Sequence, residues 1–139
     1  MLNIKTLLIL AIVAIIAIAC ATRRSKGTPT GAMPSFSNVD VDGFQTFIAA
    51  PDVQLLDVRT PDEYDEGHIA GAVLVDVNES DFEEKAMAVL DTNRPVAVYC
   101  RSGRRSARAA SPLTARGYKV TNLQGGVLAW QDAGKALVK

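Results

Sequence analysis

Cysteine and histidine are scarce in this chain of 139 residues, which contains two cysteines and one histidine. Cys20 lies in an apolar N-terminal segment, so Cys100 is the one thiol left for a folded domain. This scarcity excludes a disulfide framework and a Cys-x-x-Cys redox pair. It also argues against a metal site, because one thiol and one imidazole, His68, are too few for a typical zinc centre. We therefore expect neither a metal nor a cofactor.

Net charge is also lacking, but the charges are unevenly placed. From Phe36 onward the chain carries 11 Lys and Arg against 15 Asp and Glu, a net charge of −4. No acidic residue lies between Thr92 and Gln131, whereas this stretch holds six arginines and one lysine. An acidic domain with one local basic region does not suit a large polyanion, so nucleic acid is not an expected partner. The region suits a small anionic ligand instead.

Long apolar runs are absent apart from residues 6–22, which follow Lys5. The run contains Ala17-Ile18-Ala19-Cys20, small residues directly before a cysteine. This resembles the signal of a bacterial lipoprotein, which is cleaved before a cysteine that becomes lipidated. An uncleaved membrane anchor is the alternative, and the basic residues that follow the run would then hold the domain in the cytoplasm.

We therefore expect three parts in the chain. Residues 1–20 are a lipoprotein-type signal peptide or a membrane anchor, with Cys20 as the lipidation candidate. Residues 21–37 are rich in glycine, proline and small polar side chains, which predicts a flexible linker. Residues 38–139 form the folded domain. The expected location is the bacterial cell envelope, with a periplasmic lipoprotein favoured over an inner-membrane anchor that faces the cytoplasm.

Short apolar runs alternate with helical patterns through the domain. Because the runs are continuous rather than alternating, they predict strands buried on both faces, as in a mainly parallel sheet covered by helices. Ligands bind such sheets beyond the carboxyl ends of the strands. The expected strands are residues 53–58, 72–77, 95–99 and 118–123, and the expected helices are residues 39–50, 61–66, 79–90, 106–116 and 127–133.

Cys100 follows the strand expected at 95–99 and precedes the helix expected from Ser106. A thiol between a strand end and a helix start lies where backbone N–H groups converge and the helix dipole is positive. Both effects favour the thiolate, which is the nucleophilic form. The intervening turn adds fixed positive charge and small residues: Arg101, Ser102, Gly103, Arg104 and Arg105. The sequence thus predicts a nucleophilic cysteine and an anionic substrate.

Three segments carry a family resemblance. The first runs from Asp57-Val58-Arg59 through Glu63-Tyr64 to Gly67-His68-Ile69-Ala70-Gly71-Ala72, the second from Cys100 to Ser106, and the third joins Gly125-Gly126 to Trp130. Together they make residues 39–136 similar to a single-domain rhodanese. The resemblance implies a three-layer α/β/α sandwich around a mainly parallel sheet of about five strands.

The resemblance also implies sulfur transfer. Cys100 would take sulfane sulfur from thiosulfate, a persulfide or a polysulfide, hold it as a persulfide, and pass it to cyanide or to a thiol on a small molecule or a protein. The loop from Arg101 to Arg105 would surround the bound sulfur, and Arg101 and Arg104 are our candidates for guiding an anionic donor. The expected supporting network comprises Asp57, Arg59, Glu63, His68 and Ser106.

The same residues leave other readings open. Charged groups of the network fit a purely structural role, because buried charges must pair, and Trp130 fits the core. Gly71, Gly125 and Gly126 are expected in turns. A non-catalytic binding or scaffold module is one alternative function. A phosphatase or arsenate reductase on the same fold is another, although the C-x4-R spacing of Cys100 and Arg105 makes a tighter loop than the C-x5-R of the related phosphatases.

Overall fold

A computed structural model describes residues 35–139, which belong to one compact unit. The expected signal or anchor and Cys20 lie outside the described residues, as does nearly all of the expected linker. Within residues 35–139 no helix combines the length and apolar character needed to cross a bilayer.

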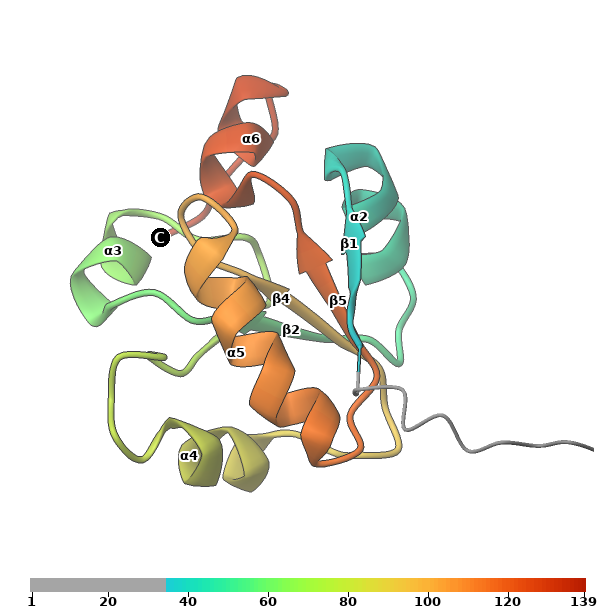
Figure 1. Cartoon of the computed structure of the whole chain (residues 1–139). Helices are drawn as coiled ribbons and strands as arrows, with labels where there is room; N and C mark the ends of the chain where they lie inside the picture. The colour runs from blue at the N-terminus through green and yellow to red at the C-terminus, as the bar shows by residue number, and fades with distance from the viewer. Residues whose placement is uncertain (1–34) are drawn as a thin grey trace, which may run out of the picture. The chain divides into compact units, whose positions relative to one another are not determined.

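Five parallel strands form one sheet in the order β1-β5-β4-β2-β3, which confirms the predicted α/β class (Figure 1). The central strand β4 is buried along its whole length, as its continuous apolar sequence predicts. The strands are β1 (Ser37–Val39), β2 (Gln54–Asp57), β3 (Val73–Leu74), β4 (Val96–Tyr99) and β5 (Val120–Leu123).

Helices cover both faces of the sheet, so the domain has the expected three layers. On one face Phe82 and Ala86 of α4 and Leu113 of α5 pack against the strands. On the other face Phe44 of α2 and Trp130 of α6 form a second core, where their rings meet edge to face. The helices are α2 (Val41–Ile48), α3 (Pro61–Glu66), α4 (Phe82–Val89), α5 (Arg104–Ala115) and α6 (Gly126–Asp132).

Local sequence signals explain several helix ends. The Asp40 side chain accepts a hydrogen bond from the Gly43 N–H and caps α2. Thr60 and Glu63 form a reciprocal capping box at the start of α3, which also has proline in its first turn. Gly117 follows α5 with φ +92°, the left-handed conformation that ends many helices.

Most boundaries differ from the sequence prediction by one or two residues, and four elements show the differences that matter for the fold or the site. Strand β1 was not expected, because Ser37 was assigned to the linker and Val39 to a helix. A strand of three residues is too short to show a periodic pattern in the sequence, and it is held in the sheet by its pairing with β5. Strand β3 has two residues rather than six. Helix α4 begins at Phe82, three residues late, and its Val89 side chain is 51% exposed. Helix α5 begins at Arg104, two residues early.

Candidate active site

Cys100 directly follows Tyr99, the last residue of the central strand β4, where the sequence placed it. The turn that follows is shorter than predicted, since it comprises Arg101, Ser102 and Gly103 alone. Gly103 adopts φ +93°, which turns the backbone back over Cys100 and starts α5. Arg104 and Arg105 therefore belong to the first turn of α5 rather than to a loop.

The Cys100 thiol is buried and receives two hydrogen bonds. The Gly103 N–H donates to Sγ at 3.1 Å, and the Ser106 hydroxyl donates to Sγ at 3.3 Å. Burial by itself would raise the pKa of the thiol. The hydrogen bonds from the Ser106 hydroxyl and the Gly103 N–H, together with the nearby backbone N–H groups of Ser106 and Ser102, outweigh burial, so the pKa of Cys100 is lowered. The site thus favours an anionic sulfur.

Substitution of Ser106 tests directly whether these hydrogen bonds lower the pKa of Cys100. In Ser106→Ala one hydrogen bond to the thiolate is lost, so the pKa of Cys100 should rise and its reaction at neutral pH should slow by roughly tenfold. The pH profile of iodoacetamide alkylation measures this, and its rising limb should move to higher pH. Ser111→Ala, an exposed change on the same helix, is the control. An unchanged profile in Ser106→Ala would contradict the assignment.

The active-site turn rests on the start of α6. The Val127 N–H donates to the Cys100 carbonyl at 2.8 Å, and the Leu128 N–H donates to the Arg101 carbonyl at 3.1 Å. Gly126 permits this close approach, because a Cβ atom there would lie 2.4 Å from the Arg101 oxygen. The sequence suggested only a turn glycine at position 126. The paired glycines of the third motif were the available signal, but nothing local showed that Gly126 meets the cysteine turn.

Glu63 and Arg105 tie helix α3 to the start of α5. Their side chains form two parallel hydrogen bonds, each 2.7 Å long. The hydrogen bond from Arg105 is the largest cause that lowers the pKa of Glu63 to about 2. Arg105 therefore has its charge matched by a carboxylate and holds the start of α5 against α3.

The rest of the predicted network divides into separate contacts. Arg59 pairs with Asp57 at 2.6 Å in a buried ion pair, and its other hydrogen bond reaches the Gly67 carbonyl. His68 stacks on Tyr64 with ring centroids 3.7 Å apart and exchanges backbone hydrogen bonds with Val138. None of the hydrogen bonds of His68 reaches the cysteine turn, and its place in a supporting network near that turn stays a prediction.

Two open pockets flank the cysteine turn. One, of about 370 Å³, is lined by Ser102, Arg104, Arg105 and Arg108, so all its charged side chains are cationic. The other, of about 340 Å³, has mixed character and is lined by Arg59, Glu63, Glu66, Arg101, Val127, Leu128 and Gln131. The two arginines expected to guide a donor therefore face different pockets. Among residues 35–139, neither Arg101 nor Arg104 makes a side-chain hydrogen bond or ion pair.

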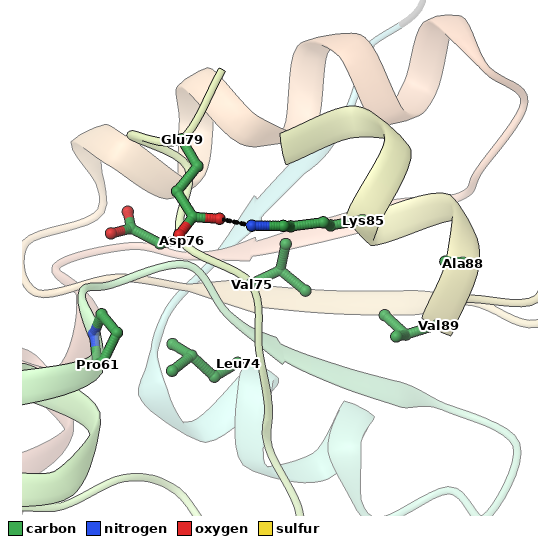
Figure 2. A pocket seen from close by; sticks show the side chains of 8 residues that line it. All are labelled: Pro61, Leu74, Val75, Asp76, Glu79, Lys85, Ala88 and Val89. Atoms are coloured by element: carbon green, nitrogen blue, oxygen red, sulfur yellow. Dashed lines mark hydrogen bonds and ion pairs between the residues drawn. The ribbon is translucent and has the colours of Figure 1, made fainter. Parts of the chain in front are cut away.

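A third hollow, of about 350 Å³, lies away from the thiol beside strand β3 and helix α4 (Figure 2). Leu74, Val75 and Val89 form its apolar wall, and the ion pair of Lys85 with Glu79 crosses its rim. No cysteine, serine or threonine lines it. In the described part of the chain no cluster of three His, Cys, Asp or Glu side chains is arranged to hold a metal ion.

Comparison with known proteins agrees with this geometry. The model of the rhodanese-like domain family matches residues 40–133. The chain is 37% identical over 107 residues to Thiosulfate sulfurtransferase 18 of Arabidopsis thaliana, covering 68% of this chain and 78% of that protein. It is 35% identical to Thiosulfate sulfurtransferase GlpE of Shewanella oneidensis, covering 73% and 98%. A crystal structure of a rhodanese-related protein from Thermoplasma volcanium superposes with a TM-score of 0.66 at 29% identity, covering 74% and 98%.

Proposed function

This chain belongs to the rhodanese-like domain family, and we propose that it is a sulfurtransferase that carries sulfur as a persulfide on Cys100. The observation that carries the proposal is the environment of one atom. Cys100 Sγ is buried at the end of β4, with the Gly103 N–H and the Ser106 hydroxyl directed at it. A binding module has no need to stabilise an anionic sulfur in this way.

The first half-reaction loads the cysteine. The Cys100 thiolate attacks the outer sulfur of thiosulfate; a sulfur–sulfur bond forms on Cys100 while the bond to the inner sulfur breaks, and sulfite leaves with the electron pair. A persulfide or polysulfide donor would react in the same way, with a thiolate or shorter polysulfide as the leaving group. The N–H groups of the turn are already oriented toward negative charge at the sulfur, so they stabilise the product without reorganisation.

The second half-reaction removes the outer sulfur from the Cys100 persulfide. Cyanide or the thiolate of a small molecule or protein attacks the outer sulfur, and Cys100 leaves as the thiolate. The negative charges balance on both sides, and no oxidant or cofactor is required.

The experiment that tests the proposal follows both halves. The protein is incubated with thiosulfate and its intact mass is measured, and cyanide is then added and thiocyanate is quantified. We expect a mass gain of one sulfur atom that cyanide removes, with thiocyanate as the product. Folded, reduced protein that gains no sulfur from thiosulfate, a persulfide or a polysulfide would contradict the proposal and favour a scaffold module. Hydrolysis of an aryl phosphate would favour the phosphatase alternative.

Arg104 is the proposed guide for an anionic donor, because it is exposed, lines the cationic pocket and forms no ion pair within residues 35–139. Arg104→Gln should raise the KM for thiosulfate about fivefold, in keeping with the modest worth of an exposed charge pair. Arg116→Gln is the matched control, since it removes one positive charge from the end of α5, where Arg116 pairs with Glu83. Equal KM values in the two variants would remove this role from Arg104.

The location of the domain is also a proposal. We place it in the bacterial cell envelope, attached through residues 1–20, with lipidated Cys20 in the periplasm favoured over an uncleaved anchor. The basis is the apolar run and its small residues before Cys20. Mass spectrometry of the membrane fraction distinguishes the two forms, because an intact Met1 would rule out the lipoprotein.

A further inference from the structure

The mixed pocket beside the cysteine turn contains two charges of opposite sign that do not pair with each other. Arg101 reaches it from the turn after Cys100, and Glu66 reaches it from the end of α3. Within residues 35–139 neither side chain forms a hydrogen bond or an ion pair. The other two charged groups of the pocket are already matched, Arg59 by Asp57 and Glu63 by Arg105. One cation and one anion therefore remain for a ligand.

The pocket also has an apolar wall, formed by Val127 and Leu128. Leu128 lines the pocket and is 41% exposed, so its side chain is accessible to a ligand there. This wall is joined to the cysteine turn, because the Leu128 N–H donates to the Arg101 carbonyl and the neighbouring Val127 N–H donates to the Cys100 carbonyl. A ligand held in the pocket would thus lie against the same segment that positions the reactive cysteine.

The opposite pocket differs in its charge. It is lined by three arginines and a serine and contains no carboxylate, so it repels a ligand that bears an ammonium group. The Arg105–Glu63 pair stands between the two pockets, since Arg105 lines the cationic one and Glu63 the mixed one. The two sides of the turn are therefore suited to different molecules.

We propose that the mixed pocket selects the sulfur acceptor and that this acceptor is a zwitterionic aminothiol, with its carboxylate at Arg101, its ammonium at Glu66 and its methylene groups against Leu128. The proposal rests on the proposed function of Cys100. The acceptor thiol releases its proton to water, and its thiolate attacks the outer sulfur of the persulfide. A new sulfur–sulfur bond forms on the acceptor, the bond to Cys100 breaks, and Cys100 leaves as the thiolate with the electron pair.

Four small thiols separate the two charge contacts: cysteine carries both groups, cysteamine only the ammonium, 3-mercaptopropionate only the carboxylate, and 2-mercaptoethanol neither. The test compares kcat/KM for each acceptor between the full-length protein and Glu66→Gln, at saturating thiosulfate. Because each acceptor is compared with itself, differences in thiol reactivity cancel. We expect kcat/KM to fall about fivefold for cysteine and cysteamine relative to the two thiols without an ammonium.

Asp65→Asn is the matched control, because it removes one negative charge from the adjacent exposed residue of α3, which does not line the pocket. The proposal is overturned if Glu66→Gln affects all four thiols alike or none, or if Asp65→Asn has the same selective effect. Persulfide loading, followed by intact mass in the same samples, shows separately whether the proposed function fails.

A binding measurement tests the pocket without turnover. S-methylcysteine is zwitterionic but has no reactive thiol, so its effect does not depend on the chemistry of Cys100. Its titration should shift the NMR signals of the Leu128 methyl groups in the wild-type protein, and the shift should weaken in Glu66→Gln. Leu128 signals that do not move in the wild-type protein would overturn the proposal even where cyanide still accepts sulfur.

Discussion

Cys100→Ser should abolish sulfur transfer from thiosulfate to cyanide, with a loss of at least about a thousandfold in kcat/KM. The hydrogen bonds to Sγ lower the pKa of the Cys100 thiol, whereas a serine hydroxyl in the same place stays protonated and cannot hold a persulfide. Thiocyanate production measures the loss, and intact mass should show no added sulfur on the variant. The substitution is nearly isosteric, so circular dichroism should show an unchanged fold.

The matched control is Cys20→Ser in the same full-length chain. Cys20 is the second of the two cysteines, and this variant should keep full activity. If transfer were lost with Cys20 and kept without Cys100, the assignment of the nucleophile would be wrong. If both variants kept activity, the sulfur would not travel through a cysteine at all.

Gly126→Ala should also lower activity strongly, for a different reason. A Cβ atom at position 126 would lie 2.4 Å from the Arg101 oxygen and 2.5 Å from the Cys100 oxygen, and both contacts are to backbone that cannot rotate away. The cysteine turn must move, and a shift of about 1 Å at a reacting group costs on the order of a hundredfold in rate. We expect a loss of roughly 3 kcal/mol in the free energy of unfolding as well.

Gly134→Ala separates backbone strain from this collision. Gly134 also has a positive φ, +73° against +61° at Gly126, but no atom lies within 4 Å of the place its Cβ would occupy. It should lose about 1 kcal/mol of stability and little activity. Urea unfolding and thiocyanate assays on both variants make the comparison. Equal activity in the two would show that the contact of α6 with the cysteine turn is unimportant for catalysis.

Several features of the domain were predictable because neighbouring residues encode them. The continuous apolar sequence of residues 95–99 predicted a buried strand, which is β4, and the helix expected at residues 61–66 is α3. The place of Cys100 between a strand and a helix followed from the same local reading. Trp130, expected in the core, is buried there.

Other features depended on contacts between distant segments. Strand β1 exists through its pairing with β5, more than 80 residues later in the chain. Arg105 was counted among the cations of the site, yet Glu63, separated from it by 42 positions, matches its charge. His68 was placed in a network by motif alone, whereas its backbone partner is Val138 near the C-terminus. These pairings cannot be inferred from hydrophobic periodicity or from the spacing of residues in a motif.

The sequence by itself determined the alternation of strands and helices, the parallel sheet and the position of the nucleophilic thiol at a strand end. These follow from burial patterns, capping and turn residues, which act over a few neighbouring positions. Only the tertiary structure decided which charges face Cys100 and how they divide between two pockets. The physical reason is that an electrostatic environment sums groups close in space, and the fold brings α3, α6 and the cysteine turn together from separate parts of the chain.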